Sequence, residues 1–223
     1  VERAGVPFMT AFNRRFDPQF AMLQRSLRDG AIGETEIVVI TSRDPSPPPV
    51  SYIEQSGGLF RDMMIHDLDM ARFLLGEDPV EISAAGSCLV DPEIGAAGDV
   101  VTAAVTLTYA DGRIAAIRNT RRAGYGDQRI ELQGSEGMLQ VGNLVENLMV
   151  KSTAAGVVSA KPVLFFLERY MPAYAAEWNA FVDALNTGED LPVTLEDGVA
   201  ALAMAEAATQ SANTGQPVRL ADV

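Results

Sequence analysis

Residues 56–73 read SGGLFRDMMIHDLDMARF, a pair of glycines that runs into a helical pattern. This stretch contains His66, the only histidine of the chain. Asp62, His66 and Asp69 stand at positions i, i+4 and i+7, so the spacing predicts that they share one helix face. Large and small apolar residues make the opposite stripe: Met64, Ile65, Leu68, Ala71 and Leu75. We therefore expect a helix with one face in the core and a second face that carries a candidate acid/base pair.

The polar face of this helix has two interpretations. An Asp and a His one turn apart can form a weak ion pair on a solvated surface. They can also act together, because a carboxylate orients an imidazole and stabilises its charged form. Gly57 and Gly58 favour the second interpretation, since glycine lets backbone or ligand approach closely and places the helix start beside a loop that can line a pocket.

The composition excludes several classes of protein. The chain has 223 residues, 48% of them apolar, which is enough for one large domain or two small ones with a real core. Its net charge of −13 disfavours nucleic acid and anionic membranes as partners. Cys88 is the only cysteine, so we predict no disulfide and no metal site. With no apolar run of transmembrane length and no signal peptide, we expect a cytoplasmic protein.

The pattern of residues predicts helices at both ends of a run of strands. Asp17-Pro18 begins a predicted helix, and Ala110-Asp111-Gly112 predicts a hairpin turn. We expect a mobile loop over 153–161 and a core stripe at Trp178, Phe181 and Leu185. Predicted strands cover 6–13, 36–42, 80–90, 100–109, 113–119, 128–133 and 138–141, and predicted helices cover 18–29, 173–185 and 195–213.

These elements predict an α+β fold with an open, largely antiparallel sheet and helices on one face. Along 100–108 both faces of the predicted strand lack charge, which is unusual for the wet face of so acidic a chain. The face of the sheet without helices is therefore a candidate contact between subunits, and we expect a homo-oligomer, a dimer or tetramer.

Several motifs together resemble the glucose-fructose oxidoreductase / inositol dehydrogenase / rhizopine catabolism (Gfo/Idh/MocA) family, and they are most similar to its inositol 2-dehydrogenases. The first motif is Ser56-Gly57-Gly58 with Asp62 and His66. The others are FNRRFDP at 12–18, SRDP at 42–45, GDV at 98–100 and RRAGYGDQR at 121–129.

This resemblance implies a substrate-binding and oligomerisation domain at 14–223, preceded at 1–13 by the tail of a nucleotide-binding domain. The strand–GxGxxG–helix fingerprint of such a domain is not found in the sequence. NAD or NADP and a catalytic lysine are then expected upstream of Val1. The chain would be a fragment, inactive alone, of an enzyme that oxidises a ring hydroxyl of a cyclitol or sugar, such as myo-inositol, to a ketone.

The resemblance also implies roles for six residues. His66 would take the hydroxyl proton with support from Asp62, while Arg15, Asp44, Tyr125 and Gln128 would bind substrate. A surface ion pair remains an alternative for Arg15 and Asp44, and a solvated hairpin end for Tyr125 and Gln128.

The sequence does not settle the substrate. Relatives read Tyr-Gly-Tyr-Asp-Gln-Arg where this chain reads YGDQR at 125–129, one tyrosine short, so the polyol stays open. Another sugar dehydrogenase of the family, or a non-catalytic carbohydrate-binding or assembly domain, remains an alternative function.

Overall fold

A seven-stranded sheet with the strand order β6-β5-β1-β4-β3-β2-β9 forms the centre of the computed structural model, which describes residues 1–223 apart from the side chain of Glu2. β1 and β4 are parallel, and all other neighbours in the sheet are antiparallel. The strands are β1 (Thr35–Arg43), β2 (Glu81–Ser87), β3 (Thr102–Thr108), β4 (Ile114–Thr120), β5 (Asp127–Gly134), β6 (Gly137–Val141) and β9 (Val218–Arg219). The predicted α+β class and its open, largely antiparallel sheet are confirmed.

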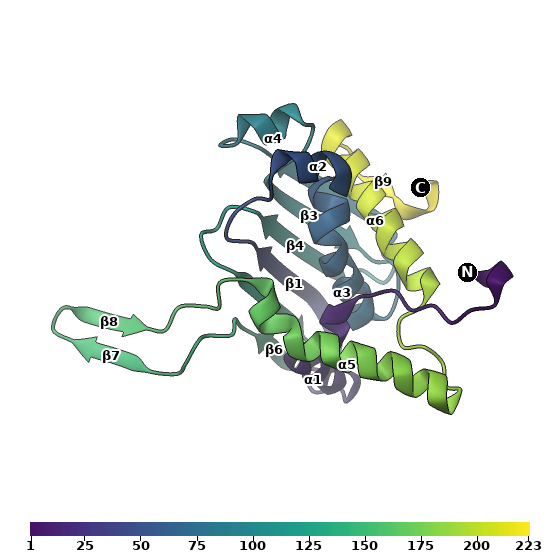
Figure 1. Ribbon diagram of the computed structural model, residues 1–223, viewed down its shortest axis with the longest axis horizontal. Helices are drawn as coiled ribbons and strands as arrows, with labels where there is room; N and C mark the ends of the chain where they lie inside the picture. Colours follow the sequence, from purple (N-terminus) through teal and green to yellow (C-terminus); the bar gives the residue numbers. More distant parts are fainter.

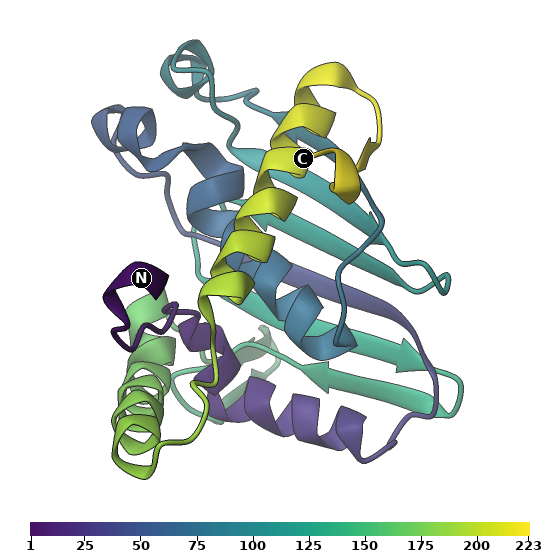
Figure 2. The same cartoon turned by 90° about the vertical axis from the view of Figure 1, so that its right-hand side faces the viewer.

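The long helices lie together on one side of this sheet, as Figures 1 and 2 show from two directions. Asp17 begins the first of them as predicted, because its side chain accepts hydrogen bonds from the backbone of Gln19 and Phe20. The α-helices are α1 (Pro18–Arg28), α2 (Val50–Ser56), α3 (Ile65–Leu75), α4 (Pro92–Ala96), α5 (Phe166–Thr187) and α6 (Leu195–Thr214). Shorter turns are the 3₁₀ helices η1 (Glu2–Ala4), η2 (Asn13–Phe16) and η4 (Leu220–Asp222), and the π-helix η3 (Phe60–Met64).

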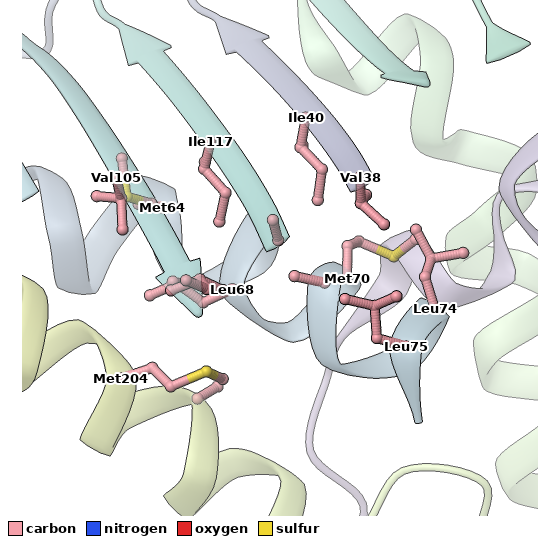
Figure 3. Packing of buried hydrophobic residues seen from close by; sticks show 14 of the residues in the cluster. Val38, Ile40, Met64, Leu68, Met70, Leu74, Leu75, Val105, Ile117 and Met204 are labelled. Atoms are coloured by element: carbon pink, nitrogen blue, oxygen red, sulfur yellow. The ribbon is translucent and has the colours of Figure 1, made fainter. Parts of the chain in front are cut away.

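The core lies between the sheet and α3 with α6. Val38 and Ile40 of β1 and Ile117 of β4 point toward this layer, as Figure 3 shows. The predicted apolar stripe of the central helix is buried at Met64, Leu68, Ala71 and Leu75, and Ile65 packs at its edge. Burying one such Leu or Met side chain stabilises the fold by roughly 1.5–3 kcal/mol. The apolar stripe therefore determines which side of α3 packs in the core and which side is left to line a site.

The strand predicted over 6–13 is wrong. Residues 6–12 form no regular element and run past the start of α6, where Thr10 Oγ1 donates to the Thr194 carbonyl at 2.7 Å. An extended segment becomes a strand only when a sheet edge accepts its backbone hydrogen bonds, and this segment lies on the helix side instead.

Two further predictions fail at the other end of the chain. Residues 153–161 are not a loop: β7 (Val150–Thr153) and β8 (Gly156–Ser159) form a hairpin that extends away from the body in Figure 1. Trp178 and Leu185 are 66% and 47% exposed, because α5 buries the side that carries Tyr170, Ala173 and Ala184. No helix among the described residues combines the length and apolarity needed to cross a bilayer.

Candidate functional site

A cavity of about 510 Å³ lies past the carboxyl ends of β1 and β4, where η2, η3 and the start of α5 meet. Four of the six predicted site residues line it: His66, Asp62, Asp44 and Gln128. The remaining lining residues are Asn13, Arg14, Ser46, Pro47, Pro48, Tyr52, Met63, Arg121, Phe165, Phe166, Tyr170 and Tyr174. The wall is thus rich in hydrogen-bonding groups, with aromatic rings among them, which suits a small polar ligand.

Asp62 is held by two donors that are not His66. Its carboxylate accepts from Tyr52 Oη at 2.7 Å and from Arg121 Nη2 at 2.6 Å. Arg121 is 1% exposed, and its Nη1 donates in turn to Asp99 Oδ2 at 3.0 Å. Asp62 and His66 therefore share the cavity, but the described hydrogen bonds of this carboxylate orient Tyr52 and Arg121 and not the imidazole.

The paired glycines lie next to the ion pairs that Arg121 forms with Asp62 and Asp99. Both have positive φ angles, 84° at Gly57 and 83° at Gly58, where side chains are strained. A Cβ at Gly58 would stand 2.8 Å from Asp99 Oδ1, which also accepts from Leu59 N at 2.9 Å. Gly58 thus lets the backbone close on Asp99, and Asp99 in turn accepts from Arg121, the donor that holds Asp62 in the cavity.

The central helix is not α-helical throughout. Residues 60–64 form a π-helix, a rare local widening that often occurs at functional sites, before α3 continues from Ile65. The predicted common face holds for Asp62 and His66, which both line the cavity. It is wrong for Asp69, which is buried against Arg15 outside it.

His66 is nearly enclosed. Its ring meets Phe12 edge-on, with 6.0 Å between the ring centroids, and its Nδ1 has no hydrogen-bond partner among the described residues. Burial lowers the pKa of His66 to about 3, and the positive charge of Arg14 adds to this shift. The imidazole is therefore neutral at pH 7, which is the state that a proton acceptor needs.

Arg14 reaches the cavity from a buried polar network that the sequence analysis missed. Its Nη1 forms an ion pair with Asp67 and donates to Ser42 Oγ at 3.0 Å. Asp67 is completely buried and also accepts from Ser42 Oγ at 2.6 Å and Asn119 Nδ2 at 2.7 Å. One signal was available: Ser42 and Asn119 are polar residues at inward positions of neighbouring strands, and the register places them side by side.

Gln128 extends this network along the cavity wall. Its Oε1 lies 3.0 Å from Ser42 Oγ and accepts from Tyr170 Oη at 3.1 Å. Asp44 differs, since no hydrogen bond from the described side chains reaches its carboxylate, and burial raises its pKa. Its carboxylate oxygens remain open to a ligand.

The structure does not bring Arg15 or Tyr125 into the cavity. Arg15 forms a two-point contact with Asp69, at 2.9 and 2.5 Å, and a further ion pair with Asp197 at the start of α6. Tyr125 lies beside a second hollow, on the sheet face opposite the helices, where its Oη accepts from Arg43 Nη1 at 2.8 Å.

The cavity can hold a ring-sized polyol, and its free carboxylate and neutral imidazole suit hydroxyl groups. The described residues contain no glycine-rich turn between a strand and a helix of the kind that binds a pyrophosphate, so no residue of this chain is assigned to a nucleotide.

The fold thus combines an open sheet that has helices on one face with a histidine in a polar cavity at the strand ends. The model of an oxidoreductase family, described as its C-terminal alpha/beta domain (GFO_IDH_MocA_C), matches residues 24–220. The chain therefore belongs to the Gfo/Idh/MocA family.

Named relatives show the same likeness. The inositol 2-dehydrogenase of Rhizobium meliloti is 48% identical over 216 residues, which are 96% of this chain and 65% of the relative. The myo-inositol 2-dehydrogenase of Thermotoga maritima is 45% identical over 223 residues, which are all of this chain and 67% of the relative. The chain thus spans about two thirds of the length of these relatives.

A solved structure shares the fold closely. A scyllo-inositol dehydrogenase from Lactobacillus casei, with bound cofactor NAD(H) and scyllo-inositol, superposes with a TM-score of 0.89 at 28% identity. The match covers 99% of this chain and 66% of that one.

Proposed function

We propose that this chain is the substrate domain of an NAD(P)-dependent dehydrogenase that oxidises a ring hydroxyl of a cyclitol, an inositol or a close relative, to a ketone. The observation that carries the proposal is a buried, neutral His66 in a polar cavity of about 510 Å³. The names of the relatives at 45–48% identity support the substrate class.

His66 has the role of proton acceptor in this proposal. An alcohol becomes a ketone only if its hydroxyl proton has an acceptor while its carbon loses hydride. A nicotinamide cofactor supplies the hydride acceptor. Burial keeps the imidazole free of a proton before the reaction. Proton transfer to His66 then leaves a positive charge in the cavity, where Asp62 and Asp44 offset it.

The substrate is held by the other polar groups of the cavity. Asp44 and Asp62 accept hydrogen bonds from ring hydroxyls, while Arg14 and Gln128 donate to ring oxygens. Arg14 here takes the part that the sequence motif suggested for Arg15.

We also propose that the chain associates with copies of itself through the sheet face without helices. The side chains of Thr102, Ala104 and Thr106 lie exposed on that face, while Ala103, Val105 and Leu107 are buried on the other. An uncharged strand surface on so acidic a protein suits a contact between subunits. We expect light scattering above micromolar concentration to give the mass of a dimer or tetramer, whereas a monomeric mass would contradict this.

We propose the cytoplasm as the compartment, where a free thiol such as Cys88 stays reduced.

The proposed activity is tested on the full-length protein that contains this chain. Myo-inositol, scyllo-inositol and representative aldoses are offered with NAD and with NADP, and formation of the reduced cofactor is followed. We expect turnover with at least one cyclitol. A folded protein that oxidises no cyclitol or sugar with either cofactor would favour a binding or assembly domain instead.

The 223-residue chain alone is expected to bind neither NAD nor NADH, because it lacks a pyrophosphate-binding turn. Calorimetric titration of the chain with each form is the measurement. A saturable one-to-one signal would show that the cofactor site lies within these residues.

A further inference from the structure

Asp67 follows His66 directly in α3 but does not line the cavity. It is completely buried and receives donors from three separate elements: Arg14 of η2, Ser42 of β1 and Asn119 of β4. Arg14 is 7% exposed, and it is the member of this group that lines the cavity, where its guanidinium carbon lies 5.8 Å from the centroid of the Tyr170 ring. A buried arginine without a carboxylate partner is strongly disfavoured, so Asp67 determines where this guanidinium sits.

Charged and titratable groups reach the cavity around His66 from every neighbouring element. They are Arg14 from η2, Asp44 after β1, Asp62 from η3, Arg121 after β4, and the phenols of Tyr52, Tyr170 and Tyr174 from α2 and α5. Asp62 and Arg121 are paired with each other at 2.6 Å. Arg14 is the charge that acts on the imidazole, and it acts in the same direction as burial.

We infer that Asp67 is a positioning residue that acts on His66 through Arg14, by locking the Arg14 guanidinium at the cavity wall beside the imidazole. The locked guanidinium disfavours a second positive charge on the ring, so the resting imidazole is neutral. Asp44 and Asp62 offset the charge once the ring accepts the proton of the substrate. This role rests on the proposed function of His66 as base, but the geometry can be tested without any turnover.

Because His66 is the only histidine, its imidazole gives a unique NMR signal in the 223-residue chain. In the wild type we expect a neutral ring down to acid unfolding. Arg14→Gln removes the repelling charge, and the ring should protonate at a pH at least ~0.5 unit higher in the folded protein. Asp67→Asn should also raise the pKa of His66, because a released guanidinium turns toward the unpaired carboxylate of Asp44, which already attracts it.

The double variant Arg14→Gln/Asp67→Asn separates this role from a general structural one. If Asp67 acts through Arg14, the pKa of His66 in the double variant equals that in Arg14→Gln alone. The double variant also leaves no unpaired buried charge, so it serves if Asp67→Asn does not fold. Arg15→Gln and Asp69→Asn are matched controls, since that pair lies outside the cavity, and should leave the His66 signal unchanged.

Three results would overturn the inference. Asp67→Asn could lower the pKa of His66, which would mean that the guanidinium stays in place without its partner. Asp67→Asn could have the same effect with and without Arg14. The His66 ring of Arg14→Gln could stay neutral to as low a pH as the ring of the wild type, although both remain folded, which would mean that Arg14 does not act on it. A full-length protein without dehydrogenase activity would instead refute the proposed function and leave these titrations valid.

Discussion

Two neighbouring arginines hold two aspartates of the same helix, with very different consequences. Arg14 pairs with Asp67 and reaches the cavity beside His66. Arg15 pairs with Asp69 and Asp197 and joins α3 to the start of α6. The residue types, their burial and the chemistry of the two pairs are almost the same. The difference is the direction in which each pair faces, toward a cavity or toward another helix.

Their adjacent positions in one helical turn account for this difference. Residues 13–16 form a 3₁₀ helix, in which successive side chains are about 120° apart around the axis. Neighbouring arginines therefore point to different sides of η2. Residue type and motif alone do not separate a ligand-binding arginine from one that fastens two helices together.

The largest expected effect is the loss of turnover when His66, the residue beside Arg14 in the cavity, is replaced. His66→Ala in the full-length protein should lower kcat roughly a hundred- to ten-thousand-fold, the usual contribution of a general base, with a much smaller change in substrate affinity. Steady-state kinetics with a cyclitol measures it, and Cys88→Ala, which changes a half-buried thiol outside the cavity, is the control. Near-normal turnover of His66→Ala would remove His66 as the base.

The next effect compares the two arginines directly. Arg14→Gln should raise KM for the polyol by about tenfold or more, because a charged donor to the ring oxygens is lost. Arg15→Gln should change KM less than about twofold. Both variants should destabilise the fold by ~3 kcal/mol, since Asp67 or Asp69 is left buried without its partner, so KM and not stability separates them. Kinetics and urea unfolding on both variants decide this, and a larger KM effect at Arg15 would reverse the assignment.

A smaller effect is expected when Gly58, which lies against Asp99, is replaced. Gly58→Ala should destabilise the fold by roughly 2 kcal/mol and lower activity, because the new Cβ collides with Asp99 and disturbs the contact that holds Arg121 and Asp62. Gly112→Ala has a similar positive φ of 93° but nothing within 4 Å of its Cβ. This control should cost only ~1 kcal/mol and leave activity unchanged. Equal losses of activity in both variants would count against a role for the Asp99 contact.

The smallest effect is a change of stability with pH. The pKa of His66 is 6.5 in the unfolded chain and about 3 in the folded one, so below 6.5 the unfolded state binds one more proton. Stability should therefore fall by ~1.4 kcal/mol per pH unit as the pH drops from 6.5 toward 3. His66→Phe lacks this term, and urea unfolding between about pH 7.5 and 5.5 should show the wild type losing more stability than the variant. If the stability of the wild type and of His66→Phe changed with pH in the same way, His66 would accept a proton as readily in the folded protein as in the unfolded chain.

Much of this architecture could be predicted from the sequence, because it follows from local patterns. Asp17 before Pro18 predicts the start of α1, and Ala110-Asp111-Gly112 predicts the turn that joins β3 and β4. The strand predicted over 6–13 is wrong because a strand also needs a sheet edge that accepts its hydrogen bonds. The local sequence does not show whether such an edge is available.

The site was only partly predictable. The motif located His66, Asp62, Asp44 and Gln128, all of which line the cavity. It could not locate the true partners of Asp62, because Tyr52 and Arg121 come from distant parts of the chain. It missed Asp67 because a buried carboxylate looks the same in sequence as an exposed one.

The proposed function requires that the cavity beside His66 receives the substrate. A crystal structure of the full-length protein with cofactor and myo-inositol tests it most directly. We expect the ring in the cavity lined by Asp44, Asp62 and Gln128, with one hydroxyl ~2.6–3.2 Å from a nitrogen of His66. A ring bound against Arg15 or Tyr125, with no hydroxyl near His66, would contradict the claim.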